Sequence, residues 1–242
     1  MLFVESAVIA AVVAYLAREL VKVLQDKIIV IAVDKVQSKW RETFANRNIA
    51  VLGNKESGKT ALIYYVQYGK PYVLSNGQVN PPNPTFASVI VGKKFELQKG
   101  NWLSIKTDVP GDKALRDTWK DVIANTKPEG IIYMIDGRLP PDKLIQEVDD
   151  IFVDVLDVFK DKSAELKVLH IFVNFCDQWA TTPKAQREVV RAVQDRFEDK
   201  MDYYKRVPDF RFGVSQTQLA PKKSSWPEVD RALLHFGADL VK

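Results

Sequence analysis

The residues with the clearest chemical potential lie in one short stretch, Gly53-Asn54-Lys55-Glu56-Ser57-Gly58-Lys59-Thr60. Glycines at this spacing let backbone N–H groups curl around an anion, because no Cβ blocks its approach. A lysine that follows directly can reach the terminal phosphates of a nucleotide, and the next hydroxyl can ligate Mg²⁺. The stretch therefore predicts a phosphate-binding loop; the other interpretation is a chance turn before a helix.

The elements on either side favour the first interpretation. The apolar run over residues 48–52 predicts a strand, and Ala61-Leu62-Ile63-Tyr64-Tyr65 continues with helical character. A strand that delivers a glycine-rich loop to a helix N-terminus is the context that this motif requires, because the helix adds the positive end of its dipole.

Further polar clusters follow other predicted strands. They are Asp108-Val109-Pro110-Gly111, Asn174-Phe175-Cys176-Asp177, and Ser215-Gln216. In an open α/β sheet, ligands bind outside the carboxyl ends of the strands. We therefore expect these clusters to meet the phosphate loop at one edge of a sheet.

From residue 47 onward, strands alternate with helices, which is typical of a parallel sheet built from βαβ units. The predicted strands are about 48–52, 86–97, 102–107, 131–135, 168–173 and 210–214. Helices are predicted at about 59–68, around 115–123, from 141 to 159, from 183 to 201, and from 227 onward. Only Gln98-Lys99-Gly100-Asn101 separates the second and third strands, which predicts a hairpin and hence one antiparallel edge strand.

Bulk composition narrows the functional classes. The 242 residues are 46% hydrophobic and 27% charged, which suffices for a buried core. The net charge of +4, from 35 basic and 31 acidic residues, is too small to indicate a nucleic-acid partner. Cys176 is the one cysteine, which excludes an internal disulfide framework and fits a reducing compartment.

The N-terminal segment has a different character. Residues 2–17 are apolar except for Glu5 and Ser6, shorter than the roughly 20 residues of a membrane-spanning helix. One long helix through about residue 45 is expected, although residues 28–33 are also compatible with a strand. Membrane spanning, surface attachment and docking on a partner stay open; we favour attachment through residues 1–17. The basic residues that follow would then place the rest of the chain on the cytoplasmic face.

The chain resembles the Ras-like small GTPases, and within them the branch of the Arf proteins and the beta subunit of the signal recognition particle receptor. The resemblance covers about residues 47–242 and rests on the phosphate loop, on Pro84-Thr85, on residues 108–119 and on residues 174–177. It implies a Ras-like P-loop NTPase fold, with a mostly parallel six-stranded sheet, one antiparallel edge strand and helices on both faces. Residues 1–45 would form the N-terminal helix and residues 46–242 the GTPase domain.

The resemblance also implies roles for the phosphate side of the site. GTP or GDP would be held by residues 53–61, ending at Ala61, with Mg²⁺ held by Thr60, Thr85 and Asp108; Ser75 and Ser88 are alternatives to Thr85. Gly111 would donate its N–H to the γ-phosphate. Because Thr85 and Gly111 would sense that phosphate, residues 70–86 and 108–118 would change order on hydrolysis and be read by an effector or receptor protein.

For the base, the resemblance assigns guanine recognition to Asp177, bracing of the loop to Asn174, and closure over the ring to Ser215 and Gln216. The family carries a lysine where this chain has Phe175, whose ring can stack on the base or belong to the core.

The expected reaction is slow hydrolysis of GTP, with Lys59, Gly111 and Asp112 as the catalytic candidates. The family's water-orienting glutamine is replaced by Asp112, which brings negative charge near a phosphate. The resemblance also implies an activating protein and an exchange factor as partners. One alternative is a scaffold or receptor subunit that binds GTP without hydrolysing it. Another is a P-loop ATPase or kinase, although Asn174 and Asp177 argue against it.

Overall fold

The structure is a computed structural model that describes residues 34–69, 93–98, 101–108, 117–157, 166–176, 180, 182–201, 211–219 and 226–242. The predicted membrane segment, residues 70–86, and the positions Thr85, Gly111, Asp112 and Asp177 lie outside these residues.

A six-stranded sheet forms the centre of the molecule, with strand order β2-β3-β1-β4-β5-β6. The strands are β1 (Asn48–Gly53), β2 (Lys93–Gln98), β3 (Asn101–Asp108), β4 (Gly130–Asp136), β5 (Val168–Asn174) and β6 (Arg211–Thr217). Neighbouring strands from β3 to β6 pair in parallel, whereas β2 pairs with β3 antiparallel at the edge. The sheet is thus mostly parallel, as the strand pattern predicts.

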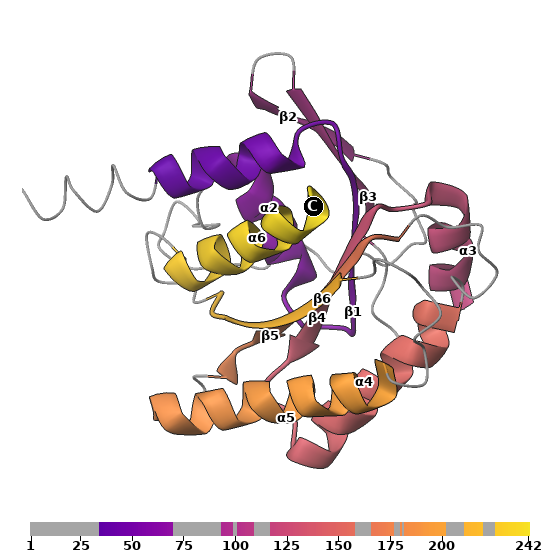
Figure 1. Cartoon of the computed structure of the whole chain (residues 1–242), viewed down its shortest axis with the longest axis vertical. Coiled ribbons are helices and arrows are strands. Elements are labelled where there is room, and N and C mark those ends of the chain that lie inside the picture. The colour runs from indigo at the N-terminus through magenta and orange to yellow at the C-terminus, as the bar shows by residue number, and fades with distance from the viewer. Residues whose placement is uncertain are drawn as a thin grey trace, which may run out of the picture.

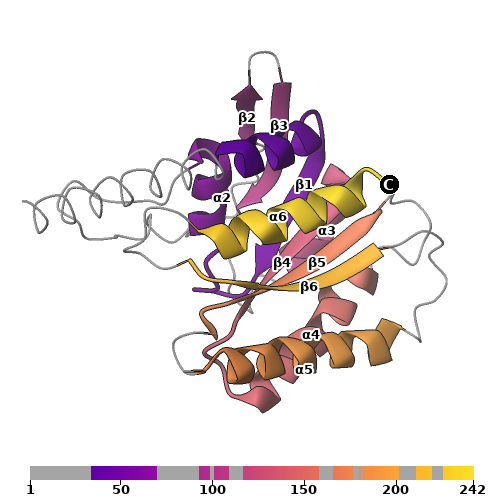
Figure 2. The same cartoon turned by 60° about the vertical axis from the view of Figure 1, so that its left-hand side comes forward.

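Helices cover both faces of this sheet (Figures 1 and 2). One face carries α3 (Asp117–Thr126), α4 (Pro141–Asp154) and α5 (Pro183–Met201). The other carries α2 (Lys59–Tyr68), α6 (Pro227–Leu240) and a further helix over residues 34–44. The predicted limits of α2 and α5 agree with those observed, and the predicted start of α6 at Pro227 is also correct.

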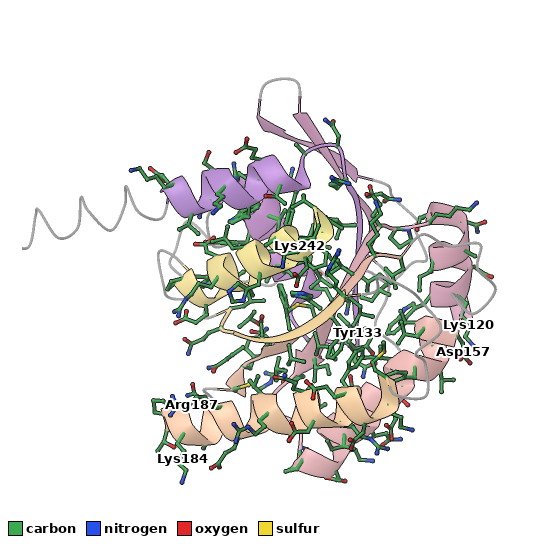
Figure 3. The ribbon with its side chains drawn as sticks, viewed as in Figure 1. Lys120, Tyr133, Asp157, Lys184, Arg187 and Lys242 are labelled. Atoms are coloured by element: carbon green, nitrogen blue, oxygen red, sulfur yellow. The ribbon has the colours of Figure 1, made fainter. Side chains whose placement is uncertain are left out.

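Alternation along the strands divides the core into two apolar clusters. In β1, Ala50 and Leu52 face α3–α5, and Ile49 and Val51 face α2 and α6. On the α3 side, Tyr133 lies among the side chains between the sheet and the helices (Figure 3). Its ring meets that of Trp119 edge-on, with centroids 5.9 Å apart. Both faces of the central strands are therefore buried, which explains their nearly continuous apolar sequences.

The helix over residues 34–44 packs into this core. Trp40 is fully buried and donates from Nε1 to Asp230 Oδ1 at 3.1 Å, while Tyr65 donates to Asp230 Oδ2 at 2.9 Å. Burial raises the pKa of the Asp230 carboxyl, although these two hydrogen bonds act in the opposite direction. Gln37 donates to the Tyr65 hydroxyl and to the carbonyl oxygen of Gly69. This helix therefore connects α2 to α6.

Within the described part of the chain, every helix falls short of the length and apolarity needed to span a bilayer. The predicted attachment through residues 1–17 stays a prediction.

Candidate functional site

The phosphate loop runs from the end of β1 to the start of α2, as the motif predicts. Two of its glycines are required by geometry. Gly53 has φ of 137°, and a Cβ there would collide with the backbone carbonyl oxygen of Met134 in β4. Gly58 has φ of 102°, and a Cβ there would lie 2.5 Å from Asn174 Nδ2 and 2.8 Å from Leu219 Cδ1. The loop thus packs closely against β4 at Gly53 and against Asn174 and Leu219 at Gly58.

The loop also has internal hydrogen bonds centred on the Asn54 carbonyl oxygen. Ser57 donates to it from its hydroxyl at 2.9 Å, and Lys59 donates from Nζ at 2.6 Å. Lys59 is only 7% exposed, so its ammonium group lies inside the loop rather than in solvent. A partly desolvated cation enclosed by backbone is suited to a polyanion, because its field is screened less than at the surface.

Helix α2 starts at Lys59 with Gly58 as its N-cap and without a capping side chain. The first N–H groups of a helix lack intrahelical partners and carry its positive dipole end. Thr60 is the second residue of this helix and is half-buried, which places its hydroxyl in the same turn as Lys59. This end of α2 has the chemistry of a phosphate site.

Asn174, the last residue of β5, contacts the phosphate loop. Its side chain is fully buried, donates from Nδ2 to the Ser57 carbonyl oxygen at 3.0 Å, and accepts from the Leu219 N–H at 3.1 Å. One amide thereby links the ends of β5 and β6 to the loop after β1. The role of Asn174 in bracing a base-binding loop stays a prediction.

The register of the strands brings the strand-end residues Asp108, Asp136 and Asn174 to the same edge of the sheet. Asp108 lies opposite Val51 of β1, and Asn174 pairs with Asp136 on one side and Thr217 on the other. Asp108 is thus the last residue of its strand, one strand away from the phosphate loop. Carboxylate and hydroxyl groups, the groups that Asp108 and Thr60 carry, are ligands of the kind that Mg²⁺ prefers. Among the described residues, none of the His, Cys, Asp and Glu side chains gather in groups of three that could hold a metal on their own.

The prediction for the end of β6 is wrong. Ser215 and Gln216 do not follow the strand but lie within it, opposite Phe172 and Val173. Gln216 donates from Nε2 to Gln186 Oε1 of α5 at 2.7 Å, so its side chain lies on the face of the sheet that α3, α4 and α5 cover. The strand continues because its pairing with β5 extends as far as Asn174, so the segment beside Asn174 is Thr217 to Leu219.

Phe175, which follows β5, has φ of 60°, a left-handed conformation that bulky residues rarely adopt. The guanidinium of Arg138 lies over its ring, 4.6 Å from the centroid. Arg138 was not identified as a site residue from the sequence. The sequence feature that could have indicated it is Asp136, an acidic residue that ends a buried strand as the polar residues of the other clusters do.

No family model matches the chain, and no curated protein matches it in sequence. Solved structures do match. An ADP ribosylation factor-like GTP-binding protein (a small COPII coat GTPase) from Encephalitozoon cuniculi, in complex with GDP, matches with a TM-score of 0.52 and 16% identity, over 93% of each chain. The mammalian SRP receptor structure matches with a TM-score of 0.54 and 14% identity, over 78% of this chain and 100% of that one.

A GTP-binding protein from the archaeon Sulfolobus solfataricus, also in complex with GDP, matches with a TM-score of 0.50 and 11% identity. That match covers 96% of this chain and 61% of the archaeal protein. The chain shares its fold with these three solved structures. At such low identity the likeness concerns the fold, which agrees with the expected Ras-like α/β architecture.

Proposed function

We propose that this chain is a guanine-nucleotide-binding switch that hydrolyses GTP slowly and signals to a protein partner. The observation that carries the proposal is the contact between Asn174 and the phosphate loop. It brings together two segments more than 100 residues apart, 117 positions as measured from Ser57 to Asn174. In the family that the sequence resembles, the corresponding segments hold the phosphates and the base of the nucleotide.

On the phosphate side, the proposal rests on Lys59, the open N-terminus of α2, and the two glycines whose backbone lets the loop curve. Thr60 and Asp108 would hold Mg²⁺, which would neutralise charge on the phosphates when bound. Thr85 would complete the metal shell and Gly111 would contact the γ-phosphate, so that residues 70–86 and 108–118 report the nucleotide state to an effector.

On the base side, Asp177 would accept hydrogen bonds from guanine, which adenine does not offer in that arrangement. The Thr217–Leu219 segment takes over the closing role that Ser215 and Gln216 were expected to have. Because Asp112 replaces the water-orienting glutamine, hydrolysis would be slow without an activating protein, and an exchange factor would control GDP release. The N-terminal segment would attach the switch to the cytoplasmic face of a membrane.

The second candidate function is a receptor or scaffold subunit that binds GTP without hydrolysing it. Asp112 favours this alternative, because a carboxylate beside the phosphate opposes attack by water. Single-turnover phosphate release, measured with and without cell extract, separates the two: a scaffold releases none in either condition.

Identification of the nucleotide that copurifies with the native protein tests the proposal directly. We expect GDP or GTP in near-stoichiometric amount, and competition by GTP but not ATP for a fluorescent guanine nucleotide. Comparable affinities for ATP and GTP would refute the guanine assignment and favour a P-loop ATPase.

A further inference from the structure

Arg138 lies where three segments of the candidate site meet. It follows the end of β4, two residues after Asp136, and forms a two-pronged ion pair with that carboxylate. Nε lies 2.8 Å from Oδ1 and Nη2 lies 2.7 Å from Oδ2. Planar pairing of this kind fixes the direction of a guanidinium group far better than a single contact.

The oriented guanidinium reaches both loops of the site. It covers the ring of Phe175 at 4.6 Å, and its Nη2 lies 3.5 Å from the carbonyl oxygen of Glu56 in the phosphate loop. Phe175 and Glu56 both have left-handed backbones, with φ of 60° and 63°. Such conformations persist only where the surroundings hold them, and they concentrate at binding sites.

We infer that Arg138 is a positioning residue of the base site, supplying from the segment after β4 the cation that position 175 lacks. The inference rests on the proposed guanine-nucleotide binding and deepens it. Arg138 holds the Phe175 ring and the phosphate loop in a fixed relation, with the ring as one wall of the base pocket. The expected consequence is slow dissociation of the nucleotide, because both loops must separate for it to leave.

A simpler interpretation is that Arg138 only closes a local turn, since its backbone N–H also donates to Asp136 Oδ1 at 3.0 Å. That turn would require neither the ring nor the Glu56 carbonyl. A matched control exists elsewhere in the chain. Arg196 of α5 pairs with Asp149 of α4 with the same two-pronged geometry, at 2.8 Å for each prong. This pair lies between two helices on the face of the sheet that α3, α4 and α5 cover.

The test is dissociation of a fluorescent GDP analogue from the full chain, chased with unlabelled GDP in a stopped-flow instrument. Arg138→Ala should accelerate dissociation about tenfold, as expected for loss of a cation–π contact and a charged hydrogen bond. Arg196→Ala removes an equivalent ion pair and should leave the rate unchanged. Arg138→Lys keeps the charge without the planar fork and should be intermediate; it also serves if Arg138→Ala does not fold.

A rescue experiment separates positioning from general stability. Adding Phe175→Lys to Arg138→Ala returns a cation to the base loop and should slow dissociation again. If the wild-type chain binds GDP but Arg138→Ala and Arg138→Lys dissociate at the wild-type rate, the inference is overturned and the proposed function stands. Equal acceleration by Arg138→Ala and Arg196→Ala, or failure of the rescue, overturns it too. If the wild-type chain does not bind the analogue, the proposed function itself fails.

Discussion

At the scale of single residues, the site depends on side chains that serve more than one segment. Asn174 bonds to the phosphate loop and to the Leu219 N–H, and Gly58 leaves room for it. A change at any of these positions is therefore expected to disturb the proposed phosphate and base contacts together.

Gly58→Ala tests this coupling. The new methyl group would meet Asn174 Nδ2 and Leu219 Cδ1 in a left-handed backbone. We expect a loss of about 1–3 kcal/mol in the free energy of unfolding and at least a tenfold weaker affinity for GDP, about 1.4 kcal/mol. Gly69→Ala is the control, because its φ of 71° imposes similar strain at the other end of α2, against the side chains of Arg41 and Gln37. Calorimetric titration with GDP would contradict the coupling if both variants bound alike.

Asp177→Asn tests the base assignment. An amide in place of the carboxylate no longer accepts two hydrogen bonds from guanine but can donate one to the extra oxygen of xanthine. We expect GTP affinity to fall by about 1–3 kcal/mol and xanthosine triphosphate to bind better than GTP. Competition binding with the two nucleotides measures the change; unaltered GTP binding would remove Asp177 from the site.

At the scale of elements, the helix over residues 34–44 is built into the domain rather than appended to it. Trp40 is buried against Phe44, with ring centroids 5.6 Å apart, and is bonded to Asp230 of α6. Gln37 reaches Gly69, where α2 ends. The helix is therefore bonded both to the C-terminal end of α2 and to α6.

Trp40→Ala should lower the free energy of unfolding by about 3–5 kcal/mol, because it creates a large cavity and leaves Asp230 with one hydrogen bond fewer. Lys39→Ala changes the exposed neighbour on the same helix and should cost no more than about 0.5 kcal/mol. Chemical denaturation of both variants measures the difference. Equal stability would show that this helix contributes little to the fold.

At the scale of the whole molecule, stability should depend on the protonation of a histidine in the central sheet. His170 of β5 is buried, and its Nε2 lies 3.0 Å from Asp239 Oδ2 of α6. Burial lowers the pKa of this imidazole below its usual value near 6.5, and the hydrogen bond to Asp239 offsets only part of the effect. The folded state therefore favours the neutral form of His170.

The pKa of His170 is lower in the folded state than in the unfolded state. The stability that its neutral imidazole contributes is therefore present above the unfolded pKa and is lost as the pH falls through the folded pKa. The free energy of unfolding should therefore decrease from about pH 7 toward pH 5. His170→Gln should make this decrease smaller. Denaturation curves across this range would contradict the assignment if His170→Gln kept the wild-type slope.

Local patterns in the sequence determined the phosphate loop, the alternation of strands and helices, and the limits of α2 and α5. These features depend on residues close together in the chain: glycine spacing, apolar periodicity, and a proline that opens α5. The same patterns predict that polar residues at strand ends converge, because parallel strands share one carboxyl edge.

Tertiary structure alone decided which residues meet at that edge. The continuation of β6 past Ser215, the stacking of Arg138 on Phe175, and the docking of Trp40 on Asp230 join segments that are remote in sequence. Such contacts depend on sheet order, register and side-chain packing rather than on local propensity. For that reason Gln216 looked like a base contact in the sequence but is bonded to α5 in the fold.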